Sequence, residues 1–205
     1  MANHYILGID VGGTKTHAVV ATTAGTIVSV ASGEGANWEN IGLEKAIAAV
    51  HKIALQVLQS ASLSFSDISA TTLAMAGADW DEDSRMLHQG LVQRGFPQNS
   101  QVVNDALAAL YAGAEDGRGC VSVAGTGGKV IGRDGEQMFS SMGGVLGEAA
   151  GAHQLSFEIL KQCVDAFNGR IEKTDIYFEL LGDSTEFDFF RSLMRDGFDP
   201  SPSFA

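Results

Sequence analysis

Two glycine-rich turns, each directly after a short apolar run, constrain the fold of this chain most strongly. The first is Asp10-Val11-Gly12-Gly13-Thr14-Lys15-Thr16 after the run 5–9, and the second is Ala124-Gly125-Thr126-Gly127-Gly128 after the run 120–123. A strand that ends in small residues exposes backbone N–H groups and hydroxyls at a sheet edge, where they can bind phosphate oxygens. A hairpin also needs glycine, but two such turns, with the isolated Asp105 before the second, indicate a phosphoryl-transfer site.

The composition is that of an ordered, acidic protein. The 205 residues are 45% hydrophobic and include 3 prolines, which allows a substantial core and argues against disorder. The formal net charge of −12 argues against nucleic acid as the main partner, because neutralising phosphates requires clustered Lys and Arg.

Neither a membrane span nor a secretion signal is visible in the sequence. No apolar run approaches the ~20 residues that cross a bilayer. The N-terminal Met1-Ala2-Asn3-His4 contains no basic segment followed by an apolar stretch. We therefore expect a cytoplasmic protein that has no membrane partner.

Cysteines and histidines do not form a metal-binding pattern. Cys120 falls in an apolar strand pattern and Cys163 on an apolar helical stripe, so both are expected to be small buried hydrophobic residues. The five histidines lack metal-ligand spacing. For His17, His51 and His88 we expect structural or surface roles.

Strand and helix patterns alternate along the chain. Runs rich in Val, Ile and Thr predict strands over 5–10, 16–22, 26–31, 70–76 and 101–103. Apolar residues at steps of three and four predict a helix over 43–60, and further helices are expected over 81–94, 106–112 and around 155–167. A hairpin over 120–124 and 129–132 encloses the second glycine turn. This order predicts an α/β, ribonuclease-H-like domain with a mixed five-stranded sheet and helices on both faces.

Asp10 ends the first predicted strand, where its carboxylate would face a cleft. A carboxylate beside phosphate-binding glycines suits Mg²⁺, which spans the β- and γ-phosphates of ATP. Alternatively, Asp10 caps the turn by accepting N–H bonds. Thr14, Lys15 and Thr16 would add donors to phosphate oxygens, although Lys15 is equally consistent with a solvated turn residue. The turn is not a Walker loop, because its spacing differs.

Asp105 stands between a short strand and a helix of small residues, which is the usual place for reactive groups in α/β sheets. A base there could accept a hydroxyl proton while that oxygen attacks a γ-phosphoryl group. The alternative is a helix N-cap, a position that aspartate favours, and the two roles can coexist.

Three loops carry side chains of the kinds that bind sugars. The segment 33–42 contains Asn37, Asn40 and an indole, although a plain connection with Asn40 capping the next helix fits equally well. The segment 76–80 either lines a pocket or forms a simple turn. In the segment 143–148, Glu148 follows glycines and could bind a sugar hydroxyl.

Four motifs in order resemble those of the N-acetylglucosamine kinase-like ATPases, the BadF/BadG/BcrA/BcrD type of the sugar kinase/Hsp70/actin superfamily. They are Gly8–Thr16, Ala76–Asp79, Asn104–Ala106 and Ala124–Gly127, and the resemblance runs from residue 5 to about residue 168. It implies an actin-like ATPase fold, with a lobe over 1–132. Residues 133–205 would then form a linker, a sugar-pocket loop and the helical start of a second lobe.

The resemblance also implies a function: transfer of the γ-phosphoryl group of ATP, with Mg²⁺, to the 6-hydroxyl of an amino sugar such as N-acetylglucosamine or glucosamine. Asp105 would be the base that deprotonates this hydroxyl. The implied phosphate and Mg²⁺ contacts are Asp10 (also the metal ligand), Gly12, Gly13, Thr14, Lys15, Gly125, Thr126 and Gly127. The implied sugar contacts are Asn37, Asp105, Gly128, Lys129, Ser141, Met142, Gly143 and Glu148.

The chain departs from the family pattern at three points. Glu148 and Ala149 replace the usual Asp-Glu pair, and Lys129 stands where small or amide side chains are usual, so a sugar other than N-acetylglucosamine is also compatible. The sequence ends before a second lobe with its adenosine-binding turn. Because phosphoryl transfer needs two lobes that close on ATP, we expect a truncated chain of weak or no activity. An exposed cleft face could then promote a homodimer.

Two other functions remain open from the sequence. An ATPase that activates an acyl-CoA dehydratase would need cysteines for an iron–sulfur cluster shared between subunits, and neither Cys120 nor Cys163 is suitably placed. A non-catalytic sugar-binding sensor would keep the sugar pocket without catalysis.

Overall fold

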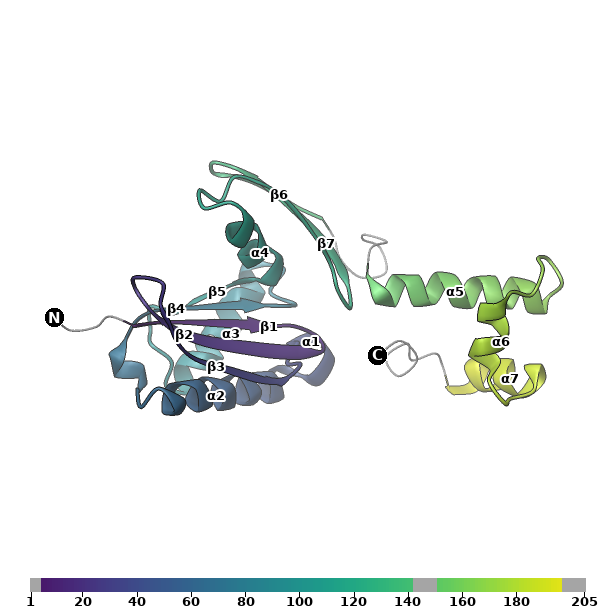
Figure 1. Cartoon of the computed structure of the whole chain (residues 1–205), viewed down its shortest axis with the longest axis horizontal. Helices are drawn as coiled ribbons and strands as arrows, with labels where there is room; N and C mark the ends of the chain where they lie inside the picture. Colours follow the sequence, from purple (N-terminus) through teal and green to yellow (C-terminus); the bar gives the residue numbers. More distant parts are fainter. Residues whose placement is uncertain (1–4, 142–150, 197–205) are drawn as a thin grey trace. The chain divides into compact units, whose positions relative to one another are not determined.

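The computed structural model describes residues 5–141 and 151–196, which divide into two compact units (Figure 1). The first unit comprises the described residues up to Val121 together with Ile131–Phe139. The second unit comprises Ser122–Val130 and the described residues from Ser140 onward.

A mixed five-stranded sheet forms the centre of the first unit. Its strands are β1 (Tyr5–Val11), β2 (Lys15–Thr22), β3 (Ile27–Glu34), β4 (Ile68–Met75) and β5 (Gln101–Asn104), in the order β3-β2-β1-β4-β5. The first three strands pair antiparallel, whereas β1, β4 and β5 pair parallel. In this register Val11 lies beside Met75, and Met75 lies beside Asn104, so the three parallel strands end at one edge of the sheet.

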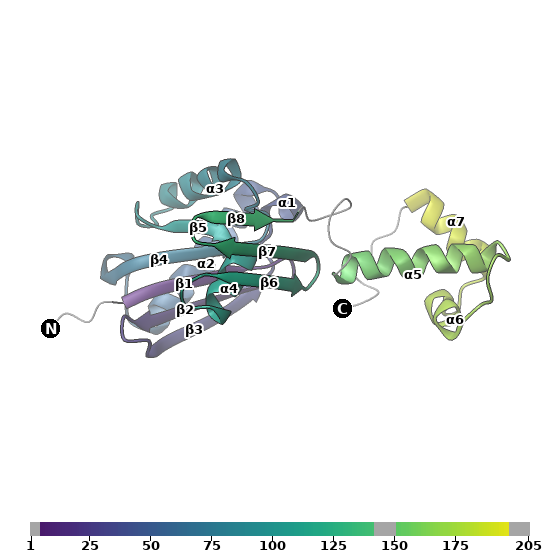
Figure 2. The ribbon, with the colours of Figure 1, turned by 90° about the horizontal axis from the view of Figure 1, so that it is seen from above.

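Helices cover both faces of this sheet, as the sequence predicted (Figures 1 and 2). They are α1 (Trp38–Ile41), α2 (Leu43–Ser60), α3 (Asp81–Gln93) and α4 (Asp105–Gly113), with a 3₁₀ turn at Phe65–Asp67. α2 packs on β2, β3 and α3, and α4 packs on β4 and β5. Apolar side chains such as Leu7, Val50 and Leu87 form a continuous core between the sheet and the α2–α3 layer. The predicted α/β fold class is therefore confirmed.

A second sheet follows α4, with the order β6-β7-β8. Its strands are β6 (Gly119–Ala124), β7 (Gly128–Asp134) and β8 (Gln137–Ser140). The predicted hairpin around the second glycine turn is confirmed, whereas β8 was not predicted. Cys120 lies on the edge strand β6 and is exposed, so the prediction that it is buried is wrong.

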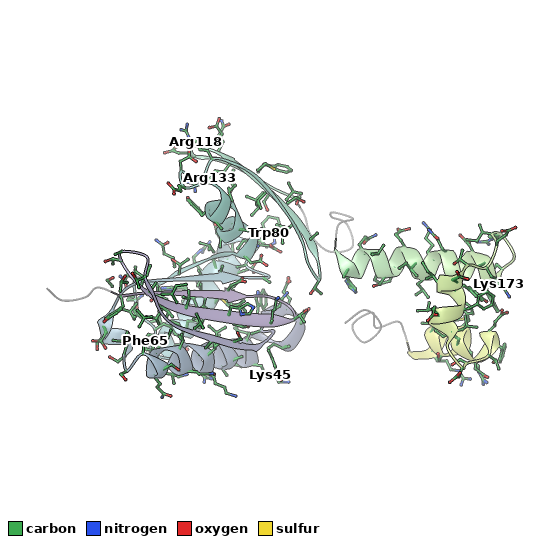
Figure 3. The ribbon with its side chains drawn as sticks, in the orientation of Figure 1. Lys45, Phe65, Trp80, Arg118, Arg133 and Lys173 are labelled. Carbon is green, nitrogen blue, oxygen red and sulfur yellow. The ribbon has the colours of Figure 1, made fainter. Side chains whose placement is uncertain are left out.

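Three helices dominate the second unit: α5 (Ala152–Phe167), α6 (Asp175–Leu181) and α7 (Glu186–Asp196). They share a small core that contains Cys163, Tyr177 and Phe190, and the predicted burial of Cys163 is confirmed. Lys173, labelled in Figure 3, donates to the carboxylate of Glu186 and joins the start of α6 to α7. Among the residues that the structure describes, no helix has the length and apolarity to cross a membrane.

Candidate active site

The carboxyl edge of β1, β4 and β5 gathers three loops of the first unit. These loops follow β3 (35–37), β4 (76–80) and β5, where α4 begins directly at Asp105. The edge is shared because β1, β4 and β5 run parallel, and such an edge is the usual ligand site of α/β sheets. Two predicted residues, Asp10 near the end of β1 and Asp105 after β5, are brought to this edge.

Asp105 is half-buried at the first position of α4. Burial raises the pKa of its carboxyl above the ordinary value, and the negative charges of Asp10 and Asp79 raise this pKa further. The N–H of Ala106, which donates to Asp105 Oδ1 at 2.9 Å, acts in the opposite direction. The charges of Asp10 and Asp79 thus both reach the carboxylate of Asp105.

Asn104, rather than Asp105, is the N-cap of α4. Its Oδ1 accepts a hydrogen bond from the N–H of Ala106 at 3.0 Å, while its Nδ2 donates to Asp79 Oδ1 at 2.8 Å. The cap was the alternative role for Asp105 in the sequence. Because Asn104 is the N-cap, the carboxylate of Asp105 is not needed to cap the start of α4.

The loops after β3 and β4 are joined by a second set of contacts. Nε1 of Trp38 donates to the carbonyl oxygen of Gly77 at 2.8 Å. Gly77 has a φ of +81°, and a Cβ at this position would lie 2.9 Å from Asn37 Oδ1. The same Oδ1 caps α1 by accepting from the N–H of Glu39. Asn37 therefore has a structural role at the edge in addition to its predicted role in sugar binding.

Asp79 and Trp80 were not among the predicted site residues, although their segment was considered as a pocket lining. Asp79 binds Asn104, and Trp80 is 64% exposed at the N-terminus of α3 (Figure 3). The signal for Asp79 was its place in the loop that follows a strand, but one sequence does not show that β4 lies beside β5. The alternative considered for Asn40, a cap of the next helix, is not what the structure has, because Gly42 is the N-cap of α2 and makes no side-chain cap bond.

The first glycine turn is closed by its own backbone and by the end of β3. Gly12 N–H donates to Lys15 O at 2.9 Å, and the N–H groups of Ala36 and Gly35 donate to the carbonyls of Gly12 and Thr14. Gly13, Thr14 and Lys15 are exposed. A phosphate at this turn would thus meet Gly13–Lys15 rather than the N–H of Gly12.

Thr16 lies outside that exposed segment. Its hydroxyl is buried and donates to Glu34 O at 2.8 Å, so the expectation that it contacts phosphate is wrong.

The second glycine turn belongs to the second unit and accepts hydrogen bonds from the first N–H groups of α5. Gly125 N–H donates to Gly127 O, while the N–H groups of Ala152 and His153 donate to the carbonyls of Gly125 and Thr126 at 2.9 and 3.0 Å. A Cβ at Gly151 would overlap the backbone of Gly127. The turn residues 125–127 are exposed, as a phosphate-binding segment requires.

Three further predicted sugar contacts lie in or beside strand β7, whose first residues, up to Val130, belong to the second unit. Gly128 and Lys129 begin this strand, and Ser141 Oγ accepts from Val130 N–H and donates to Val130 O. Met142, Gly143 and Glu148 lie outside the described residues.

Carboxylates, cysteines and histidines are the side chains that could hold a resident metal ion. In the described ranges no group of three or more such residues is arranged to hold a metal ion. His17 contacts Ser32 Oγ, His88 contacts Gln98 O, and the His51 ring packs on two phenylalanines, so the structural roles predicted for them are confirmed. The exposed carboxylate of Asp10 fits Mg²⁺ in a different manner, because Mg²⁺ bound to a nucleotide needs only one or two carboxylates besides phosphates and water.

Comparison with known proteins gives the family. Residues 7–194 match the BadF/BadG/BcrA/BcrD ATPase family, and the chain therefore belongs to this family. It is 27% identical over 180 residues to the N-acetylmuramic acid/N-acetylglucosamine kinase of Clostridium acetobutylicum, covering 86% of this chain and 59% of that protein. It is 26% identical over 193 residues to the N-acetyl-D-glucosamine kinase of Dictyostelium discoideum, covering 88% of this chain and 60% of that protein.

The fold has a solved counterpart. The crystal structure of a candidate N-acetylglucosamine kinase from Chromobacterium violaceum superimposes with a TM-score of 0.76 at 20% identity, over 98% of this chain and 71% of that chain. The chain spans about 60% of the length of the two curated relatives, the kinases of Clostridium acetobutylicum and Dictyostelium discoideum.

Proposed function

We propose that this chain carries the base and the phosphate-binding turns of an ATP-dependent carbohydrate kinase. Its substrate would be an amino sugar such as N-acetylglucosamine or glucosamine, phosphorylated on the 6-hydroxyl. The observation that carries the proposal is the half-buried carboxylate of Asp105, whose pKa is raised by burial and by Asp10 and Asp79 at the edge where the parallel strands end. The names of the two curated relatives support the choice of sugar.

In this mechanism Asp105 acts as a general base. Its ionised carboxylate accepts the proton of the sugar hydroxyl while that oxygen forms a bond to the γ-phosphorus, and the bond between this phosphorus and the β,γ-bridging oxygen breaks to release ADP. A raised pKa makes the ionised carboxylate a stronger base toward the sugar hydroxyl.

The phosphates of ATP would be held by the exposed segment Gly13–Lys15 and by Gly125–Gly127. Asp10 would hold Mg²⁺, directly or through water, and the ion would neutralise negative charge on the β- and γ-phosphates. Lys15 would add a positive charge beside the first turn. These assignments follow the match to the family's motifs.

The sugar contacts proposed for each unit are taken from the resemblance to the family's motifs. Asn37 and Asp105 come from the first, and the proposed contacts from β7 onward are Gly128, Lys129, Ser141, Met142, Gly143 and Glu148. The partners proposed for the whole protein are therefore small molecules, a sugar and ATP.

Titration calorimetry on the 205-residue chain, followed by an assay for ADP release, tests this function. We expect N-acetylglucosamine or glucosamine to bind with a Kd between about 1 μM and a few mM, the range usual for enzyme substrates. ATP with Mg²⁺ should bind as well, and the mixture should release ADP at a low rate. Sugar binding with no nucleotide binding would support a sensor instead, and the absence of any sugar binding would refute both readings.

A further inference from the structure

One backbone N–H at the start of α4 is shared by two side-chain acceptors. The N–H of Ala106 donates to Asn104 Oδ1 at 3.0 Å and to Asp105 Oδ1 at 2.9 Å. A helix N-terminus offers few free N–H groups, and a carboxylate is stabilised strongly by them. The two side chains therefore compete for the same donor.

The orientation of the Asn104 amide is determined by its second contact. Nδ2 donates to Asp79 Oδ1 at 2.8 Å, so Oδ1 faces the N–H of Ala106. With the amide reversed, its NH₂ would face another N–H and its oxygen would face a carboxylate, and both contacts would be repulsive. Asp79 thus keeps Asn104 in the capping orientation.

The charges that act on Asp105 come from two neighbouring elements. Asp10 on β1 and Asp79 after β4 both disfavour its ionised form. The strands on which α4 packs, β4 and β5, contain no charged residue. Within this surrounding the contacts that favour ionisation of Asp105 are two backbone N–H groups, that of Ala106 with the larger effect and that of Asp105 itself.

We propose that Asn104 is a positioning residue: held by Asp79, its amide oxygen shares the N–H of Ala106 and so keeps the carboxylate of Asp105 from taking this hydrogen bond alone. The role rests on the proposed function, in which Asp105 is the base. Without the Asn104 oxygen, Asp105 would receive the full hydrogen bond of Ala106 at a helix N-terminus, and its ionised form would be stabilised. A more stable carboxylate is a weaker base.

The experiment is a ¹³C NMR titration of the Asp105 side-chain carboxyl in the 205-residue chain, which requires no catalytic activity. Asn104→Ala removes the competing acceptor, and Asn104→Gly does the same with a residue that helix N-caps tolerate well. Asn104→Ser restores a capping oxygen without the contact to Asp79. Asn40→Ala is the matched control, since it makes the same change at an exposed amide of α1. Spectra of the backbone amides establish that each variant is folded.

We expect the midpoint of the Asp105 titration to fall by about 0.5–1 pH unit in the Ala and Gly variants. It should return to within about 0.3 unit of wild type in the Ser variant and stay unchanged in Asn40→Ala. If the Ala variant does not fold, the midpoints of the Gly and Ser variants are compared with that of wild type instead. A midpoint that is unchanged or higher in a folded Ala or Gly variant would overturn the proposal, as would a Ser variant as low as Gly. Failure of the chain to bind sugar would refute the proposed function but leave this titration to be judged separately.

Discussion

Trp38 and Gly77, 39 residues apart in sequence, are joined by a hydrogen bond of 2.8 Å from the indole Nε1 to the carbonyl oxygen. The bond connects the loop after β3 with the loop after β4, and the latter also carries Asp79 and reaches Asn104. Because Asn104 adjoins Asp105, all three loops at the carboxyl edge of the parallel strands are linked. Their connection, rather than any single loop, fixes the geometry of the candidate site.

Gly77→Ala should be more damaging than the same change at Gly25. Both glycines have a positive φ, +81° for Gly77 and +84° for Gly25. A Cβ at Gly77 would lie 2.9 Å from side-chain atoms of Asn37 and Trp38, whereas no heavy atom lies within 4 Å of a Cβ at Gly25. We expect Gly25→Ala to lower the free energy of unfolding by about 1 kcal/mol and Gly77→Ala by about 2–4 kcal/mol. Urea unfolding followed by tryptophan fluorescence measures this, because both tryptophans lie in the first unit. If both variants lost the same free energy of unfolding, the contact of Gly77 with Asn37 and Trp38 would not contribute to stability.

Gly151→Ala should separate α5 from the second glycine turn. Its Cβ would overlap the backbone of Gly127, and the helix would have to move off the carbonyls of Gly125 and Thr126. We expect amide hydrogen exchange at Ala152 and His153 to become at least about tenfold faster. Gly113→Ala is the control, since nothing lies within 4 Å of a Cβ there. Unchanged exchange in Gly151→Ala would contradict the close packing of turn and helix.

The two cysteines should differ in reactivity toward a thiol reagent in the native protein. Cys120 is exposed on β6, whereas Cys163 is 4% exposed and burial raises the pKa of its thiol. We expect one thiol to react rapidly and the other at least about a hundredfold more slowly, until denaturant is added. Cys120→Ser should abolish the rapid phase. Two rapid thiols would show that the α5–α7 core opens readily.

Local patterns predicted the sheet, its main helices and both glycine turns. Steps of three and four over 43–60 are enough for α2, and Val, Ile and Thr with flanking glycines are enough for β1 and β2. Asp10 and Asp105 could be assigned to one edge because each stands at the end of a predicted strand, and the ends of parallel strands in an α/β sheet share an edge.

The contacts between loops could not be predicted in the same way. Asn104 and Asp105 are both good caps, and it is the bond to Asp79 that turns the Asn104 oxygen toward the N–H of Ala106, which Asn104 shares with Asp105. Burial of Cys120 failed as a prediction because an apolar pattern does not reveal that β6 is an edge strand. The bond between Asn104 and Asp79 spans 25 residues, and the edge position of β6 depends on which strands pair with it. One sequence carries no periodic signal for either.

Asp105→Asn should alter the dependence of stability on pH. Burial and the neighbouring carboxylates raise the folded-state pKa of Asp105 above its unfolded value. The folded state therefore binds this proton more tightly, and the associated stability is fully present below the unfolded pKa and is lost as pH rises through the folded pKa. Asp105→Asn has no carboxyl group at this position and does not lose this stability, so the Tm of the variant minus that of wild type should rise between about pH 4 and pH 7. The expected rise is on the order of 1 °C, because the group is partly exposed.

Calorimetry across this pH range makes the comparison, with Asp134→Asn as an exposed control. A difference in Tm that is constant or that shrinks with rising pH would contradict the environment described for Asp105.

Phosphoryl transfer by wild type and by Asp105→Asn tests the central claim most directly. Initial rates of ADP release with N-acetylglucosamine or glucosamine would be measured on the 205-residue chain, together with sugar affinity by calorimetry. A general base accounts for about 10²–10⁴-fold in rate, so the variant should lose transfer to that extent while its sugar Kd stays within about threefold of wild type. A variant that transfers phosphate within about tenfold of the wild-type rate would contradict the assignment of Asp105 as the base.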